Sequence, residues 1–113
     1  MTQPVRRIGF LLWPGTRPLT LALAEEALHV AQRVHPEVHY QVLFLQAEPG
    51  VDAPLDGAWR LPGSPWAGQL DGLHKLLLVA DEPPTSLAPA LVAALKQAVR
   101  GGCVLGAVAA GVY

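Results

Sequence analysis

The sequence predicts an α/β protein built on a doubly wound parallel sheet. Three short apolar runs show little polar alternation, which is typical of parallel strands buried on both faces. Two longer segments between these runs have apolar residues three and four positions apart and therefore predict helices. Strands and helices thus alternate along the chain, as they do in doubly wound folds.

The composition indicates a single folded domain. A chain of 113 residues, of which 51% are apolar and 15% charged, is long and apolar enough to bury a core, which excludes a disordered segment. The net charge of -1 argues against direct nucleic-acid binding by this segment, because phosphate contacts need a basic surface. One cysteine excludes an internal disulfide framework and a cysteine-built zinc site. No signal peptide or membrane span is recognisable, so we expect a cytoplasmic location.

The first strand and the first helix are delimited by prolines. The apolar run at residues 8–13 predicts a central buried strand, which a Pro-Gly turn ends. A helix is expected from near residue 18 until Pro36 stops it, with Thr16 or Thr20 as its N-cap.

This helix is apolar on two sides. Its main stripe, which we expect to face the sheet, contains Leu19, Leu23, Glu26, Ala27, Val30 and Val34. A second stripe contains Leu21, Ala24 and Leu28. Because a sheet covers only one side of a helix, we predict that the second stripe lies near a homodimer contact.

The remaining strands follow the same pattern of short apolar runs. They are predicted at residues 38–46, 74–80 and 103–108. Residues 47–57 and 62–65 are interpreted as loops, and residues 58–61 could add a short strand between them.

The second helix has a start and a stop signal in the sequence. Ser86 is a suitable N-cap, and apolar residues recur at helical spacing from residue 87 to residue 100. The pair Gly101-Gly102 is expected to end the helix.

Two segments resemble a known protein family. They are residues 7–15, followed by helix residues 23–26, and residues 95–111. They resemble the N-terminal domain of AraC-family transcriptional regulators of the GlxA type, which belongs to the ThiJ/PfpI group of the class I glutamine amidotransferase-like superfamily. Residues 45–49 and 80–84 look most like the arginine-responsive regulators of pseudomonads.

The resemblance implies a flavodoxin-like sheet and the front part of a sensor domain. Residues 1–113 would then end just after the strand that carries the nucleophile elbow in enzymes of the superfamily. The helix-turn-helix DNA-binding domain of such regulators is not present in these residues. The resemblance therefore implies a homodimer that binds a small-molecule effector, for example an amino acid such as arginine, and reaches DNA only through that absent domain.

The resemblance also implies that catalysis has been lost. In the enzymes, a strand ends in a sharp Cys-x-Gly turn whose cysteine is the nucleophile. Gly111 matches the glycine of that turn, but Ala109 stands at the nucleophile position and Ala110 where several relatives have His. Thr20 replaces an acid of the first helix, and Asp81-Glu82-Pro83 replaces the glycine-rich oxyanion turn. The alternative, an amidohydrolase, protease or glyoxalase-like enzyme of this superfamily, is disfavoured by Ala109.

Ligands of doubly wound folds bind at the carboxyl ends of the strands, which supplies candidate binding residues. The candidates at this edge are Trp13, Pro14, Thr20, Asp81, Ala109 and Tyr113. Asp81 and Glu82 either face a cationic group such as a guanidinium or form a solvated turn. Trp13 either contacts ligand or packs in the core.

Glu26 is a further candidate, because it is an acid on a stripe expected to be buried. It either has a pocket or dimer role or is a snorkelled or structurally paired acid.

Other reactive residue types are assigned no chemistry. Cys103 is predicted to be a small buried core residue, and His35 and His39 to be surface residues rather than a metal pair. No cofactor or metal is expected. A third alternative remains, a dimerisation domain that binds no ligand.

Overall fold

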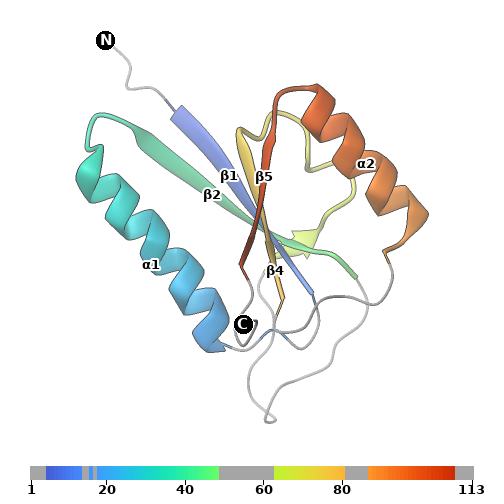
Figure 1. The fold of residues 1–113 in the computed structure, drawn as a ribbon, viewed down its shortest axis with the longest axis horizontal. Coiled ribbons are helices and arrows are strands. Elements are labelled where there is room, and N and C mark those ends of the chain that lie inside the picture. Colours follow the sequence, from blue (N-terminus) through green and yellow to red (C-terminus); the bar gives the residue numbers. More distant parts are fainter. Residues whose placement is uncertain (1–4, 14–15, 17, 49–62, 81–86, 109–113) are drawn as a thin grey trace.

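The computed structural model describes residues 5–13, 16, 18–48, 63–80 and 87–108 as a five-stranded parallel sheet with two helices (Figure 1). The strand order is β3-β2-β1-β4-β5, which confirms the predicted α/β class. The strands are β1 (Val5–Leu12), β2 (His39–Gln46), β3 (Ser64–Pro65), β4 (Lys75–Val79) and β5 (Val104–Val108). The helices are α1 (Pro18–Val34) and α2 (Pro89–Arg100).

The most apolar strand lies at the centre of the sheet. β1 pairs in parallel with β2 from Val5↔His39 onward and with β4 from Ile8↔Lys75 onward. With a strand on each side and a helix layer on each face, Phe10, Leu11 and Leu12 are fully buried. The continuous apolar run is therefore explained by burial on both faces of the sheet.

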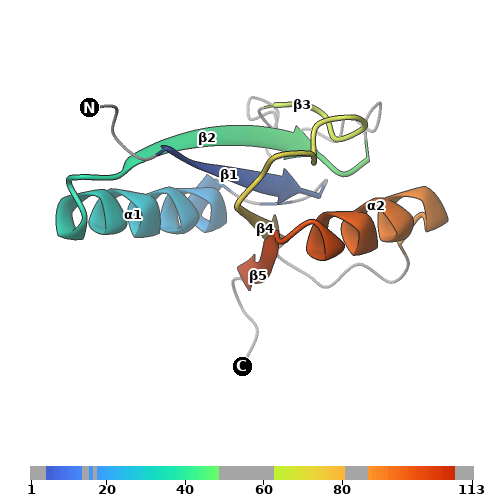
Figure 2. The ribbon, with the colours of Figure 1, turned by 90° about the horizontal axis from the view of Figure 1, so that it is seen from above.

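Alternate residues of β1 contribute to two separate core layers. Phe10 and Leu12 pack with Leu21 and Ala24 of α1. Leu11 packs in the other layer, which contains Leu91 and Leu95 of α2. Figure 2 shows the twist of the sheet, with α1 running along β1 and β2 and α2 lying near β4 and β5.

α1 faces the sheet with the opposite stripe from the one expected. Leu21 and Ala24 are buried, and Leu28 packs against the same core layer. The stripe predicted to face the sheet is exposed: Leu19, Leu23, Val30 and Val34. The spacing of apolar residues does not separate the two stripes, because both are apolar; the buried one also carries Thr20 and Ala24, small side chains that let the helix lie close to the strands.

The second helix ends as predicted, in a Schellman motif. The Cys103 N–H donates to the Ala98 carbonyl (N···O 3.0 Å), and the Gly102 N–H donates to the Val99 carbonyl (3.0 Å). Gly102 has a φ of 101°, which glycine adopts without strain. The start of the helix differs from the prediction, because Pro89 is its first residue and Ala88 its N-cap residue. The predicted cap, Ser86, lies outside the described residues.

One strand was not expected. β3 occupies Ser64–Pro65, where the sequence predicts a loop because Pro65 normally argues against a strand. It pairs with the end of β2 at the sheet's edge, where the missing N–H of a proline is tolerated. The short strand considered at residues 58–61 lies outside the described residues. Within the described parts of the chain, neither helix is long and apolar enough to cross a bilayer.

Candidate functional site

A hollow of about 480 Å³ lies at the carboxyl ends of β1 and β2, where the fold is expected to bind ligands. We call it the edge pocket. Strand ends and the start of α2 both contribute to its walls: Trp13, Ala47, Glu48, Leu87, Ala88, Pro89 and Leu91. Its volume falls within the usual range for small-molecule sites, roughly 300–1,000 Å³.

Trp13 is held firmly in the wall of this pocket. Its backbone N–H donates to the Val79 carbonyl at 3.3 Å, which ties the end of β1 to β4. The buried hydroxyl of Thr16 lies 2.8 Å from the Trp13 carbonyl and donates to it, with the Val79 carbonyl at 3.2 Å. The side chain packs with the α2 core layer and is only 6% exposed. Trp13 therefore packs in the core, as one of its two predicted roles requires, and also forms an apolar wall of the edge pocket; its contact with a ligand stays a prediction.

Glu48 is the only ionisable side chain among the described residues that line the edge pocket. It follows buried Ala47, whose N–H donates to the Leu12 carbonyl at 2.9 Å and so extends the β1–β2 ladder by one residue. This places an exposed carboxylate at the carboxyl edge, beside the wall that contains Trp13. A carboxylate in that position can form charge-assisted hydrogen bonds with an ammonium or guanidinium group.

The sequence contained a signal for Glu48 that was not used. Glu48 follows the second strand just as Asp81 follows the third, so the reasoning that selected Asp81 also applies to Glu48. The facing wall could not be predicted in the same way, because it comes from residues about forty positions away, at the start of α2.

The start of α2 contributes a partial positive charge to the edge pocket, opposite in sign to the carboxylate of Glu48. Ala88 makes no side-chain cap, and the first turn holds no acidic residue. The Val92 N–H donates to the Ala88 carbonyl, so the N–H groups of Ala90 and Leu91 have no acceptor within the helix. These groups and the helix dipole favour a negative group at this end. The pocket thus has an acidic side chain and a helix N-terminus with apolar residues between them.

The candidates predicted from sequence are not all brought together. Trp13 lines the edge pocket, whereas Thr20 is a buried residue of α1 and is not among the lining residues. Pro14, Asp81, Ala109 and Tyr113 lie outside the described residues. So does Glu82.

Glu26 does not occupy a buried stripe, and that prediction is corrected. Its side chain is 60% exposed, on the outer side of α1. Its carboxylate oxygens lie 3.6 Å from His29 Nδ1 and 3.7 Å from an Arg33 amino nitrogen. Among the alternatives for this residue, an acid paired along its own helix agrees with these contacts.

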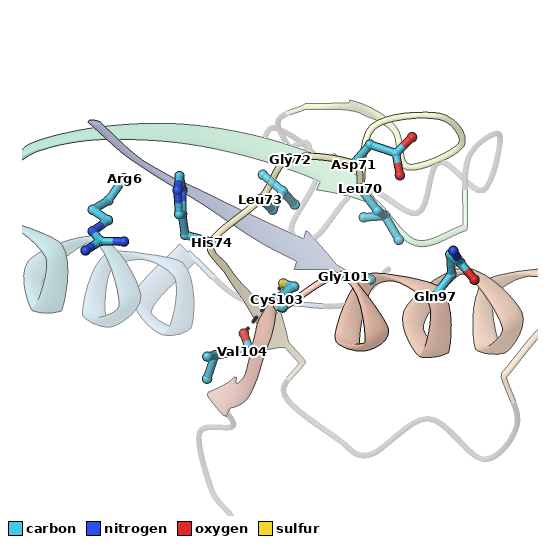
Figure 3. Close-up of a pocket in the computed structure, with 12 residues that line it drawn as sticks. Arg6, Leu70, Asp71, Gly72, Leu73, His74, Gln97, Gly101, Cys103 and Val104 are labelled. Carbon is cyan, nitrogen blue, oxygen red and sulfur yellow. Dashed lines mark hydrogen bonds between the residues drawn. The ribbon is translucent and has the colours of Figure 1, made fainter. Parts of the chain in front are cut away.

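A second hollow, of about 450 Å³, lies at the amino ends of β4 and β5 (Figure 3). Cys103 borders it and is buried, as predicted, with Sγ 3.8 Å from the Val104 carbonyl oxygen. Burial raises the pKa of the Cys103 thiol, because the thiolate would lose hydration. A thiol in this state is a poor nucleophile, so the hollow holds no activated group of that kind.

His74 at the same hollow has a structural contact. Its Nδ1 accepts a hydrogen bond from the Arg7 N–H at 2.9 Å, which links the loop before β4 to β1. Elsewhere, His35 and His39 are exposed, as predicted, and His35 Nδ1 lies 3.3 Å from a Glu37 carboxylate oxygen. Among the residues that the structure describes, no group of three His, Cys, Asp or Glu side chains is placed to hold a metal ion.

Comparison with known proteins finds transcriptional regulators. The chain is 54% identical over 113 residues to the HTH-type transcriptional regulator ArgR of Pseudomonas aeruginosa. That match covers 100% of this chain and 33% of the relative, so the chain spans about a third of the relative's length. No protein-family model matches the chain.

A solved structure supports the fold. The crystal structure of an AraC family transcriptional regulator from Pseudomonas putida superposes with a TM-score of 0.69, covering 90% of this chain and 55% of that one. The two sequences are 19% identical over the match, so this similarity concerns the fold alone.

Proposed function

We propose that this chain is the ligand-sensing part of a transcriptional regulator and that its effector is arginine or a related cationic metabolite. The observation that carries the proposal is the edge pocket, in which Glu48 faces a site bordered by Trp13 and the start of α2. The high identity to a regulator named ArgR supports the regulatory context.

The edge pocket complements both charges of a basic amino acid. The guanidinium of arginine would pair with Glu48, and its planar donors suit a carboxylate. The aliphatic stem would lie against apolar wall residues such as Trp13 and Leu91. The α-carboxylate would approach the Ala90 and Leu91 N–H groups, which lack acceptors within α2.

A second acid, which follows a strand two places along the sheet from β2, is part of the same proposal. Asp81 follows β4 in the sequence, at the edge where Glu48 follows β2. Two carboxylates would favour a dicationic group or a guanidinium over a neutral one. The remaining sequence candidates at this edge, Pro14, Ala109 and Tyr113, are retained as ligand-binding proposals.

The proposed sensing mechanism is a shift between two arrangements of the pocket walls. One wall belongs to the β1 and β2 ends and the other to α2, so a bound ligand would bridge them. Binding energy gained only in the bridged arrangement would favour that arrangement. In a full-length regulator, we propose that this change is passed to a helix-turn-helix domain and to a second copy of the chain. The role is proposed to be non-catalytic, because Ala109 stands where the enzymes have their nucleophile.

The proposal is tested by calorimetric titration of the purified chain with arginine and with citrulline. Citrulline has the same length but a neutral ureido group, so it retains the α-carboxylate and the stem contacts. We expect arginine to bind at least about tenfold more tightly, since charge-assisted hydrogen bonds are worth roughly 1.5–3 kcal/mol. Absence of binding by arginine, or equal binding of the two ligands, would reject a site built around an acidic side chain.

A further inference from the structure

The second hollow, at the amino ends of β4 and β5, brings together three segments that are far apart in the sequence. We call it the amino-end hollow. The start of β1 supplies Arg6, the loop before β4 supplies residues 70–74, and the end of α2 with the turn after it supplies residues 97–98 and 101–104. Its volume of about 450 Å³ is large enough for a small metabolite. It lies at the opposite edge of the parallel sheet from the edge pocket and shares no lining residue with it.

Polar side chains border the two ends of the amino-end hollow, and apolar side chains line its middle. The polar ones are Arg6 with His74 at one end, and Asp71 with Gln97 at the other (Figure 3). Between the two ends lie the buried side chains of Leu73 and Cys103. A ligand that spans the hollow would therefore need two polar ends joined by an apolar middle.

The two charged side chains of the amino-end hollow do not pair with each other. Within the part of the chain that the structure describes, neither Arg6 nor Asp71 forms an ion pair. Opposite charges that lie side by side on a protein surface ordinarily pair, so the hollow keeps a cation and an anion apart. Each of them remains available to a group of opposite charge on a ligand.

His74 is held in place with one ring nitrogen available as a donor. Its backbone N–H donates to the Arg7 carbonyl at 2.8 Å, its carbonyl accepts from the Val104 N–H at 3.1 Å, and its Nδ1 accepts from the Arg7 N–H at 2.9 Å. A ring nitrogen that accepts carries no hydrogen, so the neutral ring has its hydrogen on Nε2. This N–H has no acceptor among the described residues. Beside Arg6, it can donate to a carboxylate.

The other end of the amino-end hollow favours a cation. The Asp71 carboxylate and the Gln97 amide oxygen both accept hydrogen bonds. The hollow also includes the end of α2, which carries the partial negative charge of the helix dipole. A purely anionic ligand would be repelled by Asp71, and a purely cationic one by Arg6. The arrangement therefore suits a ligand that carries both charges, one at each end.

We infer that the amino-end hollow binds a small zwitterion whose carboxylate and ammonium groups are separated by a short apolar chain. Its carboxylate binds Arg6 and His74, its ammonium group binds Asp71 and Gln97, and its chain lies against Leu73 and Cys103. This is a second ligand site, distinct from the edge pocket of the proposed function. The charged groups are exposed to water, so we expect a dissociation constant in the high micromolar to millimolar range.

NMR titration of the isotope-labelled chain with ε-aminocaproate locates the site. This probe has a carboxylate and an ammonium group at the two ends of an apolar chain. We expect saturable shifts of the backbone amides of Gly72, Gly101 and Gly102, which line the hollow. Caproate lacks the ammonium group and hexylamine lacks the carboxylate, so each should bind there more weakly than ε-aminocaproate. Absence of saturable shifts at these three amides would overturn the inference.

Substitutions test which end of the hollow binds which charge. Arg6→Gln and Asp71→Asn are each expected to weaken ε-aminocaproate binding about fivefold, as followed at the amides of the hollow. Caproate binding should respond to Arg6→Gln alone, and hexylamine binding to Asp71→Asn alone. The matched control is Arg33→Gln, which removes an exposed arginine of α1 outside the hollow. Equal weakening by Arg33→Gln and Arg6→Gln, or equal responses of caproate and hexylamine to Asp71→Asn, would overturn the assigned orientation.

The same spectra separate this inference from the proposed function. The backbone amides of Glu48 and Leu91 report the edge pocket, and those of Gly72 and Gly102 report the amino-end hollow. Saturable shifts at the hollow, together with no effect of arginine at the edge pocket, would support the second site and reject the proposed sensing. Arginine binding at the edge pocket without ε-aminocaproate binding at the hollow would overturn the second site alone.

Discussion

The backbone N–H of Ala47 donates to the carbonyl of Leu12 at 2.9 Å, so the β1–β2 ladder continues one residue beyond β2. This bond fixes the chain immediately before Glu48. Trp13 lies directly after Leu12 and is held by its own bond to Val79. The acidic and aromatic residues of the edge pocket thus emerge from neighbouring strands in a fixed register, which is a requirement for a selective site.

Thr16 is expected to stabilise the chain at the carboxyl end of β1. Thr16→Val keeps the side-chain shape but removes the hydroxyl that donates to the Trp13 carbonyl. We expect a loss of about 1 kcal/mol in the free energy of unfolding, or a fall in Tm of about 4 °C. Thr16→Ser retains the hydroxyl and should lose less. Thermal unfolding monitored by circular dichroism compares the two, and equal Tm values would contradict the assigned role.

Gly9 is expected to be required by close packing at the centre of the sheet. A Cβ built there would lie 2.9 Å from Leu73 Cδ1 and 3.0 Å from Leu76 Cδ1. Gly9→Ala should therefore destabilise the fold by roughly 1–3 kcal/mol in chemical denaturation. The control is Gly101→Ala, whose Cβ would meet nothing nearer than 3.5 Å. If the control is as damaging as Gly9→Ala, crowding between the strands is not the cause.

Cys103 is expected to react slowly and to make stability depend on alkaline pH. Burial raises the pKa of its thiol above that of the unfolded chain. The stability of the fold is therefore unaffected by this thiol below its unfolded pKa. The stability falls as the pH rises from the unfolded pKa through the folded pKa, because only the unfolded state readily forms the thiolate there. Iodoacetamide should thus label the native chain at pH 8 much more slowly than the unfolded chain, and Cys103→Ser should lack the alkaline loss. Equal labelling rates would refute a buried thiol.

Asp81 is predicted to contribute to binding of the cationic group. Asp81→Ala should weaken arginine binding by well over tenfold, as expected for removal of a charged partner worth ~2–5 kcal/mol. Asp52→Ala removes the same charge at a position that does not follow a strand of the sheet, and it should leave the affinity unchanged. Calorimetry on both variants decides, and equal affinities would remove Asp81 from the site.

Most of the fold was predictable because buried parallel strands need continuous apolar runs, as β1 and β4 show. The orientation of α1 was not, because both of its stripes are apolar and only the packing of Ala24 and Thr20 near the strands selects between them. β3 was missed since Pro65 normally argues against a strand, and only its place at the sheet's edge permits it.

The sequence predicts only the part of the candidate site that lies at the end of the first strand. Trp13 was selected from the end of the first strand, and the structure places it in the wall of the edge pocket. The opposing wall, from Leu87 to Leu91, depends on how α2 docks onto the sheet, which no local pattern encodes.

The most direct measurement compares arginine binding by Glu48→Gln and Glu37→Gln in isothermal titration calorimetry. Both substitutions remove one exposed carboxylate, but only Glu48 lines the edge pocket, while Glu37 pairs with His35. We predict that Glu48→Gln weakens arginine binding at least about tenfold and leaves citrulline binding nearly unchanged, whereas Glu37→Gln binds arginine like the unaltered chain. Arginine affinity that is the same in Glu48→Gln and Glu37→Gln would contradict the proposal that the edge pocket senses a cationic ligand.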